Sequence, residues 1–239
     1  MFTDGEGDFT MAGARALEAC ARAGVEVVVV TGRGLASAQR DARILGVTSL
    51  VCECGGVLVL DGETQWLAAR DDEGRTPHEQ IDRSGAPALL LERFAAEGLR
   101  YLAPYHLGRE VTHLLCGRVD AADGQALLDA HGHGDLRLLD NGAAPDGERI
   151  LILLPEGISK ATGVAAHRRA RGYAERDCIA VGDSPEDVGM AAVVGRCFGV
   201  ANGVGGAGVL RTEKGYGAGV YEAVVTTLTE RRAQGPRSG

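Results

Sequence analysis

The stretch Cys178-Ile-Ala-Val-Gly-Asp-Ser-Pro-Glu-Asp187 decides the fold class of this 239-residue chain. Its first four residues are apolar without alternation, which is typical of a strand buried on both faces of a parallel sheet. Gly182 frees the backbone, and Asp183 then falls at the carboxyl end of the strand, where open α/β sheets bind their ligands. The sequence therefore predicts an α/β fold with a carboxylate at the ligand-binding edge of its sheet.

A second carboxylate, Asp187, follows in the first turn of the next predicted helix. Two carboxylates this close repel by a few kcal/mol at an effective dielectric constant of about 20. A divalent cation relieves that repulsion, and hard oxygen ligands suit Mg²⁺. Helix capping offers a second explanation, because Ser184 is a good N-cap and Pro185 a good first helical residue. Capping explains Asp187 as well, but it leaves Asp183 unexplained.

The composition restricts the class of protein. A formal net charge of −8 and a pI near 5.3 argue against nucleic acid or an anionic membrane as the main partner. The sequence has no apolar run of about 18 residues and no signal-peptide pattern. Its six cysteines are scattered without a CxxC pair, which favours free thiols in a reducing compartment. We therefore expect a cytoplasmic protein.

Strand and helix patterns alternate in residues 1–72 and again in 155–239, which predicts a Rossmann-like parallel sheet covered by helices. The expected elements are a helix over Thr10–Gly24, a buried strand over Val25–Val30, a helix over Leu35–Leu45, a strand over Leu50–Cys54, a hairpin over Val57–Gly62, a helix over Ser159–Arg171, the Cys178 strand, a helix after Pro185 and a strand over Cys197–Val200.

Residues 73–154 have a different pattern, helix-strand-strand repeated twice, which predicts an inserted α+β cap domain with a small antiparallel sheet. Its expected elements are helices near Ala86–Glu97 and Ala121–Ala130 and strands near Leu99–Leu102, Glu110–Arg118, Leu136–Asp140 and Arg149–Leu154. From Thr226 onward, and above all over 230–239, the charged and Gly/Pro/Ser-containing sequence predicts a disordered tail.

Two further segments of the α/β part carry candidate binding groups. Thr31-Gly32-Arg33 follows four valines, and its hydroxyl and backbone N–H groups suit a phosphate oxygen; simple strand-to-helix punctuation is the alternative. Lys160 follows Ser159, a good N-cap, so it lies in a first helical turn, where a cation is unfavourable by roughly 0.3–1 kcal/mol. Surface lysines tolerate that position, but Lys160 and the helix N-terminus also suit an anion held between them.

Taken in chain order, Thr31 in VVVVTGR, Lys160 in GISKATGVAAH, and the acids of AVGDSPEDVGM resemble the second, third and fourth motifs of the haloacid dehalogenase superfamily. The stretches 200–203 and 212–220 resemble its phosphoglycolate, mannosyl-3-phosphoglycerate and sucrose-phosphate phosphatase branch, which carries an α/β C2-type cap between motifs two and three. The resemblance spans nearly the whole chain.

The resemblance implies a Mg²⁺-dependent hydrolase of a small phosphorylated acid or sugar that works through an aspartyl-phosphate. It implies that Asp183 binds the metal and that Asp187 supports the site. It further implies that Thr31, with Gly32 and Arg33, binds a phosphate oxygen, and that Lys160 ties the nucleophile to the phosphate.

The superfamily's first motif is DxDGT, and Asp4-Gly5-Glu6-Gly7-Asp8 is the segment here that resembles it. On that reading Asp4 is the nucleophile and a metal ligand, and Glu6 is the general acid/base. However, the three residues before Asp4 make only about 10 Å of strand, whereas a typical strand has about five or six residues. Thr10, the predicted helix cap, follows Asp4 after six residues, and members of the superfamily usually have about twice that spacing between nucleophile and helix. We therefore favour a start truncated upstream of Met1, or an inactive relative, in which catalysis is lower by a factor on the order of a million.

Three weaker signals complete the sequence reading. Arg109, Glu110 and His113 surround a strand start in the cap and are candidates for contacting the substrate, with solvated strand ends as the alternative. Gly32-x-Gly34-x-x-Ser37, with Glu53 further on, is a near match to a nicotinamide-dinucleotide fingerprint. The histidines of 131–133 suit a metal, although an exposed Gly-rich turn explains them better.

Overall fold

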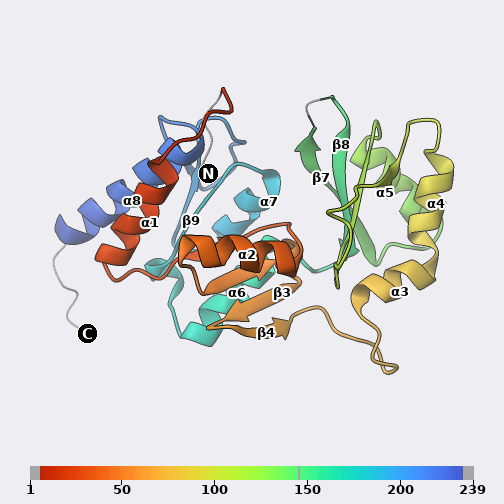
Figure 1. The fold of residues 1–239 in the computed structure, drawn as a ribbon, viewed down its shortest axis with the longest axis horizontal. Helices are drawn as coiled ribbons and strands as arrows, with labels where there is room; N and C mark the ends of the chain where they lie inside the picture. The colour runs from red at the N-terminus through yellow and green to blue at the C-terminus, as the bar shows by residue number, and fades with distance from the viewer. Residues whose placement is uncertain (1–5, 145, 234–239) are drawn as a thin grey trace. The chain divides into compact units, whose positions relative to one another are not determined.

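The structure is a computed structural model that describes residues 6–144 and 146–233. It divides into two compact units, which we describe separately (Figure 1). The first comprises Met1–Val28, Ile44–Val47 and Val164–Gly239, and the second comprises Val29–Arg43 and Thr48–Gly163. The segment 73–154 lies entirely in the second unit together with part of the α/β sequence, so its separation as an inserted domain stays a prediction.

The first unit contains the strand predicted from Cys178 onward, which is β9 in a three-stranded parallel sheet of order β11-β10-β9. The register places Cys197 opposite Ala180 on one side and opposite Val209 on the other. This arrangement confirms the predicted α/β class. Strand β11 was not expected from the sequence. The bounds are β9 Ile179–Gly182, α7 Pro185–Val188, η3 Gly189–Ala192, β10 Arg196–Gly199 and β11 Val209–Arg211.

Two helices of the first unit, α1 (Ala12–Arg22) and α8 (Tyr216–Ala233), lie side by side (Figure 1). Ala16 and Cys20 of α1 pack against Val224 of α8 in one small core. The expectation of a disordered tail from Thr226 is wrong as far as Ala233, because α8 continues to that residue. Residues 234–239 lie outside the described residues.

The second unit contains a sheet of order β1-β2-β3-β4, in which β2, β3 and β4 are antiparallel neighbours. The predicted hairpin is confirmed, with Asp61 and Gly62 at its turn in the left-handed region (φ 50° and 90°). Strand β2 is shorter than expected and ends at Cys52, because Glu53 turns the chain with φ 48°. The bounds are β1 Val28–Val30, α2 Leu35–Leu45, β2 Ser49–Cys52, η1 Glu53–Gly55, β3 Val57–Leu60 and β4 Glu63–Trp66.

The second sheet of this unit is antiparallel, with order β5-β6-β8-β7, and α3, α4 and α5 cover one of its faces (Figure 1). Side chains alternate across it: Leu115 and Leu153 face the helices, whereas Leu114 and Ile152 pack on the other face against Cys54. Helix α3 was missed by the sequence reading. The bounds are α3 Pro77–Ser84, α4 Ala86–Arg93, β5 Arg100–Tyr101, β6 His113–Gly117, α5 Ala121–Ala130, β7 Leu136–Ala143 and β8 Arg149–Pro155.

Helix α6 (Lys160–Arg171) confirms the helix predicted over Ser159–Arg171. The boundary between the two units falls within this helix, between Gly163 and Val164. Among the described residues, no helix has the length and apolar character needed to cross a membrane.

Candidate functional site

The loop 31–34 of the second unit follows β1 and is fixed to the end of β2. The Thr31 N–H donates to the Val51 carbonyl at 2.8 Å, and the Thr31 carbonyl accepts from the Cys54 N–H at 3.1 Å. The Thr31 hydroxyl oxygen accepts from the Arg33 N–H at 3.2 Å. A Cβ atom at Gly32 would lie 3.1 Å from Ile152 and 3.3 Å from the Cys54 sulfur, so a side chain fits here only if these neighbours shift slightly. The loop is thus a fixed turn with one hydroxyl and a glycine, which suits close approach of an anion.

The guanidinium of Arg33 forms an ion pair with Asp41 of α2. Both side chains are exposed enough for water to screen that pair, so it contributes little to stability. A phosphate would compete with Asp41 for Arg33. The predicted role of Arg33 in phosphate binding therefore stays a prediction.

Arg109 reaches the same loop. Its Nη1 donates to the Gly32 carbonyl at 3.0 Å and to the Thr112 hydroxyl at 2.6 Å, and its Nε donates to the Tyr105 carbonyl at 3.0 Å. Burial lowers the pKa of Arg109, and the charge of Glu53 acts in the opposite direction. A predicted cap residue and the predicted phosphate loop are therefore joined by a direct hydrogen bond.

Glu53 is fully buried and fixes the backbone of residues 110–112, which follow Arg109. Its Oε2 accepts from the Val111 N–H at 2.9 Å, from the Thr112 N–H at 2.9 Å and from the Thr112 hydroxyl at 3.1 Å. Its Oε1 accepts from the Glu110 N–H at 3.1 Å. The sequence reading missed this role, although Glu53 follows a buried strand directly, which is the same signal that identified Asp183.

The other two cap candidates diverge from Arg109. The carboxylate of Glu110 pairs with Arg70 at 3.0 Å. His113 is fully buried, and its ring stacks on that of His78 with centroids 3.8 Å apart. Substrate contact by Glu110 and His113 stays a prediction, and among the described residues neither side chain hydrogen-bonds to the loop 31–34.

Lys160 is buried and begins α6, whose first turn is firmly anchored. The Thr162 N–H donates to the Ser159 hydroxyl at 3.1 Å, and the Ser159 N–H donates to the Thr162 hydroxyl at 3.0 Å. A Cβ atom on Gly55 would overlap the Ser159 carbonyl oxygen, and one on Gly163 would overlap Val51. These two glycines let the helix start approach the η1 turn at backbone distance, which fixes the position of Lys160.

In the first unit, Asp187 closes the loop after β9. Its Oδ2 accepts from the Asp183 N–H at 3.1 Å, from the Ser184 N–H at 3.0 Å and from the Ser184 hydroxyl at 2.8 Å. Ser184 caps α7 in return, so the two residues form a capping box. A Cβ atom on Gly182 would overlap the Asp187 side chain. The capping explanation from the sequence is therefore confirmed for Asp187.

Asp183 differs, because its carboxylate has no hydrogen-bond partner among the described residues. Its backbone is nevertheless held on both sides, since its carbonyl accepts from the Val204 N–H at 3.0 Å and Gly203 packs against its Cα atom. A fixed backbone with an open carboxylate fits a hard cation such as Mg²⁺. On this geometry Asp183 would hold the ion directly, and Asp187 would orient Asp183.

The contacts above do not include Asp4 or Glu6, and they do not join the two compact units. Asp4 lies outside the described residues, and Glu6 is exposed. The candidate groups of the second unit (Thr31, Arg109 and Lys160) and those of the first belong to different compact units, so their convergence on one site stays a prediction.

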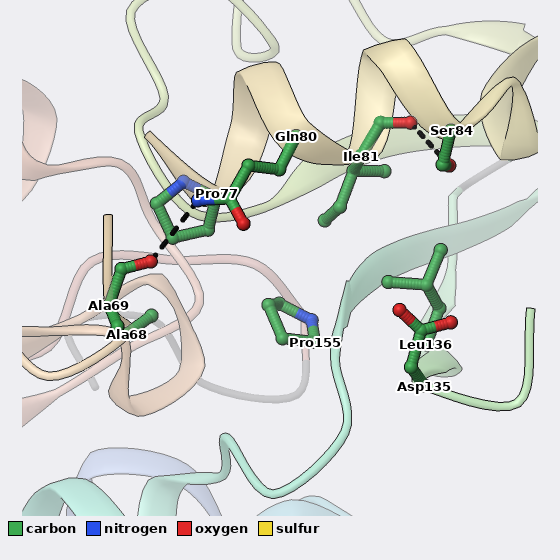
Figure 2. Close-up of a pocket in the computed structure, with 9 residues that line it drawn as sticks. All are labelled: Ala68, Ala69, Pro77, Gln80, Ile81, Ser84, Asp135, Leu136 and Pro155. Atoms are coloured by element: carbon green, nitrogen blue, oxygen red, sulfur yellow. Dashed lines mark hydrogen bonds between the residues drawn. The ribbon is translucent and has the colours of Figure 1, made fainter. Parts of the chain in front are cut away.

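A pocket of about 160 Å³ in the second unit contains none of the predicted site residues. Figure 2 shows it between α3 and the ends of β7 and β8, with Gln80 hydrogen-bonded to the Ala69 carbonyl at 3.2 Å and Ser84 to that of Ile81 at 2.7 Å. Its volume is below the roughly 300–1,000 Å³ of sites for small-molecule ligands. We assign no function to it.

The dinucleotide alternative loses its main support. Glu53 is the acid of the near-match fingerprint, a position that binds a ribose hydroxyl in dinucleotide sites, but both of its carboxylate oxygens accept hydrogen bonds from residues 110–112. The glycines of the fingerprint lie instead beside Arg109, with a Cβ atom on Gly34 3.5 Å from its Cγ.

Comparisons with known proteins agree with this geometry. A family model described as haloacid dehalogenase-like hydrolase matches residues 138–207. The phosphoglycolate phosphatase of Methanoculleus marisnigri is 27% identical over 84% of this chain and 82% of its own length. That of Halorubrum lacusprofundi is 29% identical over 76% of this chain and 73% of its own. A crystal structure from Thermoplasma acidophilum matches with a TM-score of 0.73 and 16% identity, covering 94% of this chain and 92% of that one.

Proposed function

Because the chain belongs to the haloacid dehalogenase superfamily, we propose that it is a Mg²⁺-dependent phosphatase of a small phosphorylated acid or sugar. The observation that carries the proposal is the Asp183 loop. There, three hydrogen bonds to Asp187 fix the backbone while the Asp183 carboxylate stays open.

In the proposed reaction a carboxylate oxygen of Asp4 attacks phosphorus, and the bond from phosphorus to the leaving oxygen breaks. The Glu6 carboxyl group gives its proton to that oxygen, then takes one from the water that hydrolyses the aspartyl-phosphate. The phosphate product leaves and Asp4 is restored. When bound, Mg²⁺ supplies positive charge that stabilises the transferring phosphoryl group.

The residues of the second unit would receive the phosphoryl group. The Thr31 hydroxyl can donate a hydrogen bond to one phosphate oxygen while it accepts from Arg33. Lys160, buried at the start of α6, adds a positive charge next to helix N–H groups, a combination that binds anions. Positioned donors of this kind stabilise charge that develops in a transition state.

The substrate class follows from Arg109 and from the relatives. Arg109 lies against the loop 31–34, and because its Nε and Nη1 hydrogens go to Tyr105, Gly32 and Thr112, its Nη2 group is the part left to donate to a substrate carboxylate. Both curated relatives are named phosphoglycolate phosphatases. Phosphoglycolate, a phosphorylated acid, is therefore the first substrate to test, with sugar phosphates second. The six free cysteines support a reducing, cytoplasmic location as part of the proposal.

The test is hydrolysis of p-nitrophenyl phosphate and phosphoglycolate by the purified chain, with Mg²⁺ and with EDTA. We expect turnover that needs Mg²⁺ and falls by about a hundredfold or more in Asp183→Asn and in Asp4→Asn. The control is Asp72→Asn, which changes an exposed loop carboxylate and should leave the rate unchanged.

The alternative is an inactive relative that retains phosphate- and metal-binding groups. The short spacing between Asp4 and α1, which begins at Ala12, favours it. Equal background rates for the unmodified chain and Asp4→Asn would establish this alternative and remove Asp4 as the nucleophile.

A further inference from the structure

Three histidines gather in the second unit, from segments that are distant in sequence. His78 lies on α3, His106 on the turn after β5, and His113 at the start of β6. Each offers one ring nitrogen, and these nitrogen atoms all lie within 4.8 Å of one another. The rings of His78 and His113 are stacked, and the ring of His106 lies 5.3 and 5.5 Å from them.

The hydrogen bonds of two of these rings determine where their protons are. The His78 Nδ1 lies 2.9 Å from the Thr112 carbonyl, and the His113 Nε2 lies 3.0 Å from the His78 carbonyl. Because a carbonyl oxygen only accepts, each of these nitrogens carries the hydrogen. The lone pairs are therefore on Nε2 of His78 and Nδ1 of His113. Metal-binding histidines are oriented in the same way, with the second ring nitrogen donating to a backbone carbonyl.

The lone pair on Nδ1 of His113 accepts no hydrogen bond from the described residues. This Nδ1 is buried, and the residue is 0% exposed. Buried polar atoms without a partner are rare in native proteins, and each one calls for an explanation. A bound cation is such an explanation, since it would accept this lone pair together with those of the neighbouring rings.

Asp82 supplies negative charge beside the cluster. Its carboxylate lies 3.9 Å from the His78 Nε2, which carries a lone pair, and 3.8 Å from the His113 Nε2, which carries a hydrogen, and its side chain is 53% exposed. The ring of Tyr101 stacks on His106 at 4.0 Å and orients it. The cluster thus has three imidazoles with a half-exposed carboxylate beside them.

We propose that His78, His106 and His113 form a binding site for a transition-metal dication of the Zn²⁺ type, with the Asp82 carboxylate beside the His78 Nε2. Imidazole suits Zn²⁺, Ni²⁺ and Cu²⁺, whereas Mg²⁺ takes oxygen ligands. This site is therefore chemically distinct from the one at Asp183. It would join α3, the turn after β5 and β6 into one cross-linked group.

The rings must move inward to bind. Four-coordinate Zn²⁺ holds nitrogen ligands at about 2.0–2.1 Å, which separates them by about 3.3 Å. The 4.8 Å limit of the cluster exceeds this by about 1.5 Å, so the stacked rings would tilt and His106 would approach. His106 is the ring held least tightly, because its Nδ1 contact with the Leu114 N–H is 3.5 Å long.

A metal here would also act on the candidate phosphate loop. The Thr112 carbonyl accepts from His78, while the Thr112 N–H and hydroxyl donate to Glu53 and the same hydroxyl accepts from Arg109. One residue thus connects the histidine cluster to the contact between Arg109 and Gly32.

The test is calorimetric titration of the EDTA-treated full chain with Zn²⁺ in excess Mg²⁺, which occupies carboxylate sites. We expect one Zn²⁺ per chain, an affinity lower by about tenfold or more in His106→Gln, and an unchanged affinity in the double variant His131→Gln/His133→Gln. The double variant removes the other pair of histidines, which lie near α5.

Co²⁺ spectroscopy then identifies the ligands. Visible bands of tetrahedral Co²⁺ without thiolate charge-transfer bands are expected, since imidazoles and not cysteines bind. Thiolate bands, absence of stoichiometric Zn²⁺ binding, or equal affinity in His106→Gln would each overturn the proposal. Circular dichroism of His106→Gln confirms that the variant folds, and Asp82→Asn, which keeps all three rings, should bind with intermediate affinity.

Discussion

The Glu53 carboxylate accepts two hydrogen bonds from Thr112, one from its backbone N–H at 2.9 Å and one from its hydroxyl at 3.1 Å. These residues are far apart in sequence, and both are fully buried. The carboxylate thereby fixes the segment that carries Arg109. The buried Glu53 carboxylate is stabilised by these N–H and O–H donors. If its charge is removed, the buried donors lose a good acceptor, which costs free energy of folding.

Replacement of Glu53 by glutamine should therefore destabilise the second unit. The amide keeps the shape, but its NH₂ group faces N–H donors, and we expect a loss of about 2–4 kcal/mol in the free energy of unfolding. Urea denaturation measures this loss. Glu63→Gln, on the exposed face of β4, is the matched control and should change stability by less than about 0.5 kcal/mol. Equal stability of the two variants would contradict the assigned role of Glu53.

Substitutions of Asp183 and Asp187 should differ in their effects on stability and on Mg²⁺ binding. Asp183→Asn removes an open carboxylate, so we expect weaker Mg²⁺ binding with stability nearly unchanged. Asp187→Ala removes the acceptor of three hydrogen bonds, so we expect a loss of about 1–3 kcal/mol as well as weaker Mg²⁺ binding. Thermal unfolding with and without Mg²⁺ measures both quantities. If Asp183→Asn were the more destabilising variant, the two roles would be reversed.

Gly55 should tolerate no side chain. Its φ of 106° is unfavourable for other residues, and a Cβ atom would overlap the Ser159 carbonyl oxygen. We expect Gly55→Ala to cost about 3 kcal/mol or more and to displace the start of α6, because both the backbone strain and the overlap must be relieved. Gly134→Ala, with open space around its Cα atom, is the control. Chemical denaturation of both variants decides whether the Gly55 contact is as tight as described.

The metal-free protein should lose stability between about pH 6.5 and pH 4. Burial and the neighbouring His78 lower the pKa of His113 from 6.5 to about 4, while the Asp82 carboxylate opposes this and His106 adds to it. The unfolded state therefore binds a proton at a higher pH than the folded state does, so stability is complete above about pH 6.5 and falls as the pH drops. The expected loss is on the order of 2–3 kcal/mol.

Denaturation of EDTA-treated protein at several pH values measures this dependence. His113→Gln should flatten the profile in this window relative to the unmodified chain, whereas His131→Gln, which changes an exposed ring, should not. A profile unaffected by His113→Gln would show that other groups cause the loss.

Much of the fold could be predicted because its patterns are local. Helices α2 and α5 have the predicted bounds, since each has an apolar face and clear ends. Helix α3 has equally clear signals in Thr76, Pro77 and Glu79, which form a capping box. It was missed because its sequence is mostly polar and follows a charged linker. The continuation of α8 past Thr226 was missed because the tail is charged and ends in a Gly/Pro/Ser-containing stretch, which is typical of disordered segments.

The candidate site was predictable only in part, for a different reason. Thr31, Lys160 and Asp183 lie at strand ends or helix starts, so the sequence places them. Arg109 reaches Gly32 only because Glu53 fixes the intervening backbone, and no local pattern encodes that contact. The three clustered histidines have irregular spacings, so only tertiary contacts among α3, the turn after β5 and the start of β6 bring them together.

Gly55, the last residue of η1, and Gly56, which follows it, bring the two ends of a long segment together. The Gly56 carbonyl accepts from the N–H groups of Leu67 and Ala68, and Gly55 abuts the Ser159 carbonyl. The stretch from Ala69 to Ile158 thus departs and returns at neighbouring points of the backbone. A segment whose ends meet can be lengthened, shortened or exchanged without spreading the strands on either side of it. In this chain the junction for such exchange is a pair of residues without side chains.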